Sequence, residues 1–264
     1  MTVFMPRADR RRTPRRVFVD VGGHVGETVQ AAVDPIYGFD IIYSLEPVRS
    51  CALAISALGH ERVAVLSAGL SNECRPRPII GAGSEAGSVY DDFPDAHERG
   101  GAEVCSFLRA SEFFGSVLLE GDRVWVKMNC EGSEVAILED LLESGIIGRI
   151  QELLVCFDAR KIPRLATKVP DLIERIAKVD GLRLSLPEQV MFGTGSHFGA
   201  IKNWLDRTGA RRGGLSAKGA SLRFHVANVA KGRHVGFYKL KIVRLLPPRF
   251  MSFYYERLRV LFKH

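Results

Sequence analysis

Residues 17–28 read VFVDVGGHVGET, a β-branched run that leads into glycines and then into a helix-compatible stretch. Gly22 and Gly26 allow a tight turn after the strand, where a backbone can approach a nucleotide-like ligand. Asp20 precedes these glycines, whereas the dinucleotide fingerprint is G-x-G-x-x-G with its acidic residue further along the chain. A carboxylate in this position repels a pyrophosphate but suits the amine-bearing end of S-adenosylmethionine. The loop predicts that cofactor, and a purely structural turn is the alternative.

A second acidic residue, Glu46, ends the next apolar run in the sequence YSLEP, followed by Pro47. An acid at the tip of the second strand is placed to accept hydrogen bonds from both hydroxyls of a ribose. Enzymes that use NAD have the same arrangement, so Glu46 indicates an adenosine ligand without choosing between the two cofactors.

A third group of polar residues, KMNCEGSE over 127–134, ends a later apolar run. Methyl transfer to an alkyl hydroxyl needs a proton acceptor near the reacting oxygen. Acids at this position also suit the plain role of stabilising a helix N-terminus. A further candidate, His197, follows a Gly-rich turn and is equally well read as a surface residue. The expected catalytic residues are Glu131, Asp158 and His24.

Taken together, the three groups resemble the FkbM family of methyltransferases, which shows D-x-G-A-N-x-G, then E-P, then K-x-D-x-E-G-x-E. The matching positions, in order over 17–160, are Asp20, Gly22, Gly26, Glu46, Pro47, Lys127, Glu131, Gly132 and Glu134. The resemblance implies an α/β, Rossmann-like seven-stranded sheet with helices on both faces, and methyl transfer from S-adenosyl-L-methionine to oxygen. The cofactor-binding residues expected are Asp20, Gly22, Gly23, His24, Gly26, Thr28, Glu46, Pro47, Ser67 and Asn129.

Two positions depart from the family pattern. His24 stands in place of the usual Asn, where it can keep a polar contact to the cofactor or supply a base. Asn129 stands in place of an aspartate, which removes a negative charge beside the expected reaction centre. Magnesium favours carboxylates, so no metal site is expected there. The proton acceptor must then be another group, unless the protein has lost activity.

The elements that must position these residues alternate short apolar runs with helix-compatible stretches, the pattern of a parallel βαβ sheet. Strands are expected at 16–22, 39–47, 62–71, 123–132 and 150–160. Helices are expected at 26–34, 48–59, 106–117, 133–147 and 170–181. The segments 182–188 and 196–204 are expected to form a closing antiparallel pair. Residues 72–104 are expected to be a loop, in which a Gly-rich lid at 81–95 brings Ser88 and Tyr90 near the ligands; a plain surface loop is the alternative.

The charge of the chain is distributed unevenly. Residues 1–16 hold 6 Arg and 1 Asp, and residues 201–264 hold 15 Lys and Arg against 2 Asp and Glu. We therefore expect a basic N-terminal arm at 1–16, a methyltransferase domain at 17–204 and a basic, aromatic C-terminal extension at 205–264. Such asymmetry points to an anionic partner.

Within the extension, residues 237–264 interleave Lys and Arg with aromatic and aliphatic residues. A basic amphipathic helix of this kind can lie in a membrane interface, so peripheral membrane contact is one expectation. Docking onto the core or a contact in an oligomer is favoured over it. No apolar run reaches the roughly 20 residues of a membrane span, and the scattered cysteines lack any CxxC pair. The expected location is the cytoplasm, with the inner membrane face as a site of association.

The sequence thus favours an S-adenosylmethionine-dependent O-methyltransferase acting on a small-molecule or glycan acceptor, such as a sugar or secondary-metabolite hydroxyl. A nucleic-acid methyltransferase is an alternative, although the charge of the central region opposes a nucleic-acid partner. A non-catalytic binding protein that kept the fold is another, because of Asn129. A nicotinamide oxidoreductase is the weakest reading, since the glycine spacing does not suit it.

Overall fold

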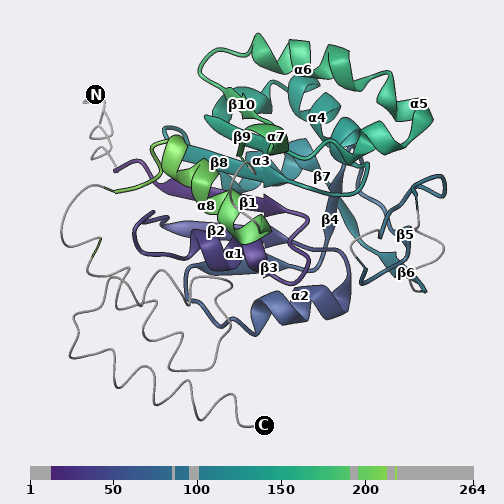
Figure 1. Cartoon of the computed structure of the whole chain (residues 1–264), viewed down its shortest axis with the longest axis horizontal. Coiled ribbons are helices and arrows are strands. Elements are labelled where there is room, and N and C mark those ends of the chain that lie inside the picture. The colour runs from purple at the N-terminus through teal and green to yellow at the C-terminus, as the bar shows by residue number, and fades with distance from the viewer. Residues whose placement is uncertain (1–12, 85–86, 95–100, 191–195, 213–217, 219–264) are drawn as a thin grey trace, which may run out of the picture. The chain divides into compact units, whose positions relative to one another are not determined.

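A computed structural model describes residues 13–84, 87–94, 101–190, 196–212 and 218. Six parallel strands form its central sheet, in the order β10-β9-β8-β1-β2-β3 from top to bottom in Figure 1. They are β1 (Arg16–Val21), β2 (Ile41–Leu45), β3 (Val63–Leu66), β8 (Arg123–Met128), β9 (Glu152–Val155) and β10 (Arg183–Ser185). The α/β class and the parallel sheet predicted from the alternating pattern are confirmed.

Helices cover both faces of this sheet, as expected. One face packs against α3 (Ala110–Val117), α4 (Glu134–Glu143) and α6 (Val169–Ala177). The other meets α1 (Glu27–Ala32), α2 (Arg49–Ser56) and α8 (His197–Arg207). Shorter helical turns are η2 (Ile146–Arg149), η3 (Asp158–Lys161), α5 (Pro163–Ala166) and α7 (Pro187–Val190).

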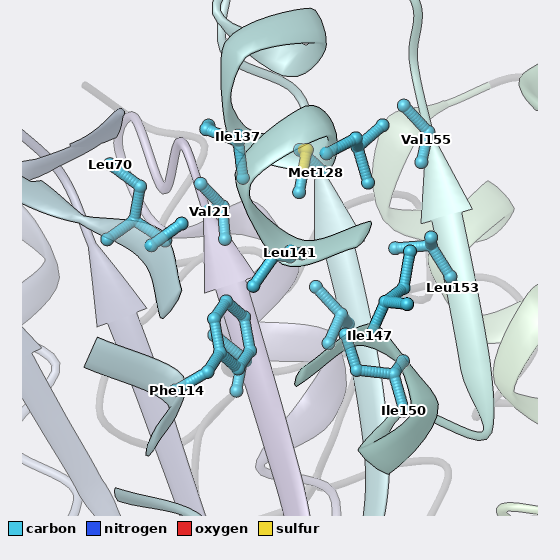
Figure 2. Close-up of a cluster of buried hydrophobic side chains, with 14 of the residues drawn as sticks. Val21, Leu70, Phe114, Met128, Ile137, Leu141, Ile147, Ile150, Leu153 and Val155 are labelled. Atoms are coloured by element: carbon cyan, nitrogen blue, oxygen red, sulfur yellow. The ribbon is translucent and has the colours of Figure 1, made fainter. Parts of the chain in front are cut away.

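Alternation along the strands decides which side chains meet which helices. Val17, Val19 and Val21 of β1 join the core beneath α4, which Figure 2 shows over β1, β8 and β9. Phe18 points to the opposite face, where its ring lies 6.2 Å from that of Trp204 on α8. Asp20 continues on this second face, so a charged residue ends an otherwise apolar row at the carboxyl end of the strand.

The expected closing pair of strands is wrong, and the central sheet has six strands among the described residues instead of seven. The segment 182–188 does contain a strand, β10, but β10 runs parallel to β9. The segment 196–204 is the start of helix α8. The hydroxyl of Ser196 caps this helix by accepting a hydrogen bond from the N–H of Gly199 at 3.1 Å. Apolar residues at helical spacing then face the core: Phe198, Ile201, Trp204 and Leu205.

Two other expectations are corrected by a small second sheet. The strand predicted at 62–71 divides into β3 and β4 (Gly69–Ser71), and the helix predicted at 106–117 begins with a strand, β7 (Phe107–Arg109). β4 and β7 pair with each other. A Cβ on Gly69 would lie 2.3 Å from the ring of Phe107, so the glycine is what lets these strands approach. The loop predicted at 72–104 contains an antiparallel pair, β5 (Arg77–Ile80) and β6 (Ala102–Cys105).

The folded body extends past both predicted domain boundaries. Arg16 begins β1 and stacks on the Trp125 ring, 4.7 Å from its centroid. At the other end α8 continues to Arg207, and the N–H of Arg212 donates to the carbonyl of Ile36 at 2.7 Å. The chain divides into units 1–213 and 214–264. The segment 237–264, expected to meet a membrane, lies outside the described residues, and none of the described helices is long and apolar enough to cross a bilayer.

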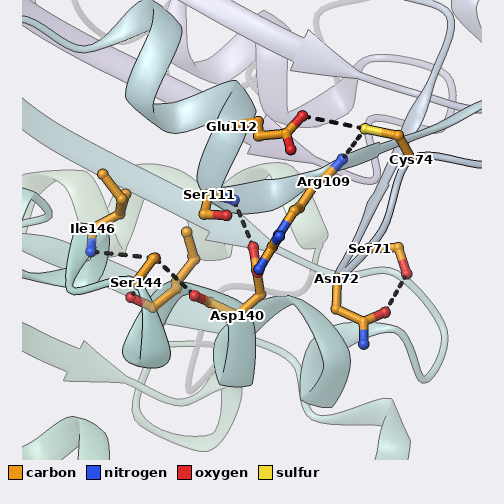
Figure 3. Close-up of polar contacts among 10 residues, drawn as sticks. Ser71, Asn72, Cys74, Arg109, Ser111, Glu112, Asp140, Ser144 and Ile146 are labelled. Carbon is orange, nitrogen blue, oxygen red and sulfur yellow. Dashed lines mark hydrogen bonds and ion pairs between the residues drawn. The ribbon is translucent and has the colours of Figure 1, made fainter.

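A buried carboxylate joins the helices on one face. Asp140 of α4 accepts a hydrogen bond from the Nε of Arg109 and another from the N–H of Ser111, both at 2.7 Å (Figure 3). These contacts fix the start of α3 against α4. Since α4 follows directly on residues 127–134, the bonds also fix the helix that leads away from that loop.

We predict that Leu141→Ala lowers the free energy of unfolding by about 2–5 kcal/mol, because the side chain is fully buried in the core of Figure 2 and its removal leaves a cavity. The control is Leu53→Ala on α2, where the leucine is 60% exposed and the expected change is within about 0.5 kcal/mol. Urea unfolding followed by circular dichroism measures both. Equal effects of the two substitutions would contradict this assignment of the core.

Candidate functional site

A cavity of about 380 Å³ opens at the carboxyl ends of β1, β2, β8 and β9. The chain leaves β1 toward β2 on one side, while β8 joins β1 on the other, so the strand order reverses here. Open α/β sheets bind ligands at such a switch point, and small-molecule sites have volumes of roughly 300–1,000 Å³. The position and size of the cavity therefore suit a ligand the size of a nucleoside derivative.

The loop after β1 is held tightly against the neighbouring strands. The N–H groups of Gly22 and Gly23 both donate to the carbonyl of Leu45, at 3.0 and 3.2 Å. A Cβ on Gly22 would lie 1.8 Å from the carbonyl oxygen of Asn129, and φ at Gly22 is +80°. Gly26 has φ +91° where α1 begins. The predicted tight turn is confirmed, but what fills the space beside Gly22 is the backbone after β8 rather than a ligand.

Asp20 lies beneath the cavity and does not form its described lining. Its carboxylate is fully buried and lies 3.1 Å from the Nζ of Lys127, which also donates to the carbonyl of Gly22 at 2.6 Å. Ser44 donates to the same carboxylate at 3.3 Å. Burial raises the pKa of Asp20, and Lys127 opposes that shift. Asp20 therefore acts on the site through Lys127, which does line the cavity.

Glu46 lines the cavity at the tip of β2, as expected, together with Pro47. One carboxylate oxygen accepts the N–H of His24 at 2.8 Å, and the other accepts the N–H of Val48 at 2.9 Å. Burial is the main cause of a raised pKa, which these two bonds oppose. Each oxygen keeps a second lone pair for a donor in the cavity.

Asn129 also lines the cavity, directly after β8. Its side-chain oxygen is buried and has no hydrogen-bond partner within the described structure. A buried polar atom of this kind costs free energy until a donor meets it. The amide oxygen thus offers an acceptor for a ligand donor.

Three acidic residues gather on the β9 side of the site. Glu134, the first residue of α4, accepts hydrogen bonds from the N–H groups of Cys130, Gly132 and Ala159 at 3.0–3.1 Å. It thereby ties the loop after β8 to the loop after β9, which goes beyond the helix-terminus role considered for it. Burial first, and then the charge of Asp158, raises the pKa of Glu134 to about 7 against the pull of these N–H donors.

Glu131 lines the cavity in a strained backbone conformation, with φ +46°. The left-handed region is costly for a residue with a Cβ, and such strain concentrates at functional sites. The hydroxyl of Ser88 donates to the Glu131 carbonyl at 2.6 Å. Burial, followed by the charges of Glu134 and Asp158, raises the Glu131 pKa well above its usual value. Asp158 is nearby in the lining and pairs with Lys161 at 2.6 Å.

His197 belongs to the cavity, although the sequence left its position undecided. It is the first residue of α8, and its Nε2 lies 3.2 Å from the hydroxyl of Thr28. Burial is the main cause that lowers its pKa to about 4, and Lys127 and His24 add to this. The imidazole is therefore neutral at pH 7. The signal in the sequence was the serine cap at Ser196, which predicts a helix beginning at His197.

Most of the predicted site residues meet at this cavity. Ser67 and Gly26 do not line it: Ser67 is exposed at the end of β3, and Gly26 lies at the start of α1. Ser88 is buried behind Glu131, and Tyr90 packs against Gly132 rather than entering the lining. The sequence did not single out Lys161 or Cys156 as part of the site. The predicted residues that line the cavity are Gly22, Gly23, His24, Thr28, Glu46, Pro47, Asn129, Glu131 and Asp158.

No protein-family model matches the chain, and no curated protein matches it. Among solved structures, a similar chain is the methyltransferase FkbM from Methylobacillus flagellatus KT, with 16% sequence identity and a TM-score of 0.41. The aligned region covers 62% of this chain and 37% of that one, so the present chain spans little more than a third of that protein's length.

We predict that the free energy of unfolding falls as the pH rises from about 4.5 to about 7. Glu134 has a higher pKa in the folded protein than in the unfolded chain, so the folded state binds more protons in this window and loses that advantage as the pH rises. Glu131 acts in the same direction. Glu134→Gln should reduce the fall by up to about 3 kcal/mol.

Denaturant unfolding at half-unit pH steps measures this slope. Glu139→Gln on the outer side of α4 is the control, because Glu139 forms an exposed pair with Lys168. A wild-type slope unchanged by Glu134→Gln would contradict the assignment of the raised pKa to this carboxyl.

Proposed function

We propose that this protein is an S-adenosylmethionine-dependent methyltransferase that transfers a methyl group to a hydroxyl oxygen. The observation that carries the proposal is the pairing of two acceptors across one cavity: the carboxylate of Glu46 at the tip of β2 and the unpaired amide oxygen of Asn129 at the tip of β8. The Gly22–Gly23 turn, which is hydrogen-bonded to the carbonyl of Leu45, also lines this cavity.

The residues fit an adenosine ligand that carries an amino acid. Glu46 has a lone pair free on each oxygen, which matches the two hydroxyls of a ribose. The Asn129 oxygen is buried and needs a donor, which an α-ammonium group would supply. In the bound state the cofactor would supply an electrophilic methyl group. A pyrophosphate is disfavoured, because Glu46, Glu131 and Asp158 all bring carboxyl groups to the lining.

Methyl transfer is a displacement in which positioning contributes most, and the protein must also receive the proton of the acceptor hydroxyl. Glu131 fits the proton acceptor best. It lines the cavity, its raised pKa makes its carboxylate a stronger base, and the bond from Ser88 holds its backbone in place. Asp158 is already paired with Lys161 and is therefore a weaker proton acceptor. Its role in the proposal is to orient the acceptor molecule.

Glu131, Asp158 and Lys161 together offer several hydrogen-bonding groups at one end of the cavity. A polyhydroxylated acceptor such as a sugar or glycan would use them, as would the hydroxyl of a secondary metabolite. The further proposal that residues 237–264 bring the enzyme to the inner face of a membrane rests on their basic and aromatic composition.

We predict that S-adenosylmethionine and S-adenosylhomocysteine bind to the purified protein, whereas NAD does not. Glu46→Gln should weaken this binding by roughly 10–100-fold, because one acceptor for a ribose hydroxyl becomes a donor. Isothermal titration calorimetry measures the dissociation constants. Glu103→Gln is the matched control, since Glu103 accepts a hydrogen bond from Arg49 outside the cavity lining. Binding of NAD alone would rule out the proposed cofactor.

A second prediction concerns the proton acceptor. Glu131→Gln should lower methyl transfer at least 100-fold while S-adenosylhomocysteine still binds, because the amide cannot take up a proton. Transfer of a labelled methyl group from S-adenosylmethionine into a glycan or metabolite extract measures the activity. Glu27→Gln, an exposed acid at the rim of the same cavity, is the control. Full activity of the Glu131→Gln variant would show that another group accepts the proton.

A further inference from the structure

Two arginines face each other at the amino edge of the central sheet, the edge opposite the cavity. Arg16 begins β1 and Arg123 begins β8, and the two residues are directly paired in the register of these strands. The Cζ atoms of their guanidinium groups lie 4.7 and 5.5 Å from the centroid of the same ring, that of Trp125. Four positions further along both strands, Asp20 and Lys127 are paired in the same way but with opposite charges. The row is thus neutral at the cavity and positive at the amino edge.

A third arginine, Arg212, reaches the same place from beyond α8. Its side chain lies against Gly38, where an added Cβ would be 2.4 Å from the Arg212 Nε. Burial is the main cause that lowers the pKa of Arg16; the charges of Arg212 and Arg123 add to this, and Asp40 opposes it. Three guanidinium groups therefore repel one another in one small region, the arginine cluster of Arg16, Arg123 and Arg212.

The acidic residues beside the arginine cluster do not neutralise it. Asp40 is exposed, and one of its carboxylate oxygens accepts the backbone N–H of Arg16 at 2.8 Å. Asp206 is already paired with Arg211 at 3.5 Å. Within the part of the chain that the structure describes, the two exposed members of the cluster form no ion pair. The cluster therefore keeps a net positive charge, which an anion would stabilise.

The arginine cluster also keeps many N–H donors, of which each guanidinium has five. Arg16 donates through Nε to the carbonyl of Tyr37 at 3.1 Å and through Nη2 to that of Ala210 at 2.5 Å, which leaves three. The exposed Arg123 stacks on its tryptophan. Guanidinium forks match phosphate oxygens, and a phosphomonoester brings three such oxygens and nearly two charges at pH 7. A carboxylate, with two oxygens and one charge, matches three guanidinium groups less well.

Both basic ends of the chain join the domain at this edge. The described chain begins at Thr13, just before β1, and the contact of Arg16 with Ala210 brings the segment after α8 to the same place (Figure 1). The residues beyond, 1–12 and 213–264, are rich in Lys and Arg. The cavity is at the other end of β1, roughly 16 Å away, so an anion here would not compete with a ligand there.

We propose that Arg16, Arg123 and Arg212 form a binding site for a phosphomonoester group. Such a group is carried by soluble phosphate esters and by the headgroup of phosphatidic acid, and both present the same anion to the cluster. When bound, it offsets the repulsion between the paired arginines and stabilises the folded domain. The site is independent of the proposed function, because none of the three arginines lines the cavity.

The two tryptophans of the chain allow a test inside the domain. Trp125 lies against the arginine cluster, Trp204 is fully buried in α8, and residues 1–12 and 213–264 contain no tryptophan. Glycerol 3-phosphate should move the indole N–H signal of Trp125 in a saturable way in proton–nitrogen NMR spectra, and that of Trp204 less. Arg123→Gln should weaken this binding roughly fivefold to tenfold, because one charge-assisted contact is lost.

Arg49→Gln is the control, because it removes one exposed charge at the start of α2, at the other edge of the sheet. It should bind glycerol 3-phosphate as the wild type does. A shift of Trp125 that sodium chloride reproduces at equal ionic strength would overturn the site. Equal affinity of the wild type and Arg123→Gln for glycerol 3-phosphate would also overturn it.

Vesicles of phosphatidylcholine, with and without phosphatidic acid, distinguish the two sources of the phosphate group. If the lipid is the source, Arg123→Gln should weaken sedimentation with phosphatidic acid vesicles about fivefold, and Arg49→Gln should do so less. If Arg123→Gln lowers the affinity for glycerol 3-phosphate alone, the site takes a soluble ester.

Discussion

The ion pair between Asp20 and Lys127 joins the two central strands, β1 and β8, near their carboxyl ends. Both side chains are almost completely buried, so each charge depends on the other, and breaking such a pair typically costs about 3–5 kcal/mol. The ammonium also holds the Gly22 carbonyl, and the glycine turn in turn lies against Asn129. One buried contact thus sets the shape of both loops on which the cavity depends.

From this pair the cavity divides into two chemical halves. The half beside α1 holds Lys127, which is paired with Asp20, together with the imidazoles of His24 and His197. On the side of β9, Glu131 stands in a left-handed backbone conformation that the Ser88 hydroxyl and the bonds of Glu134 maintain. Backbone strain and buried charges are concentrated at this edge of the sheet. The core beneath α4, by contrast, is packed with hydrophobic side chains. This contrast is typical of a site that must hold a polar ligand in a fixed orientation.

Local pattern was sufficient to predict the main strands and the loops that follow them. Asp20, Glu46 and Asn129 each end an apolar run, and parallel strands bring such ends to one edge of a sheet. The predictions that were wrong concern segments whose structure depends on residues far away in the sequence. The segment 196–204 looks extended by composition, but its serine cap and its packing against α1 make it a helix. That Asp20 lies beneath the cavity is decided in the same way by Lys127, and the entry of His197, which the sequence left open, depends on its contact with Thr28; both partners are more than 100 positions away.

A crystal structure of the protein with S-adenosylhomocysteine tests the central claim most directly. We predict that the ribose hydroxyls bind to Glu46 and the ammonium to the Asn129 oxygen, with the sulfur directed toward Glu131. A ligand bound outside the carboxyl ends of β1, β2 and β8, or bound there with its adenosine against Glu131, would contradict it.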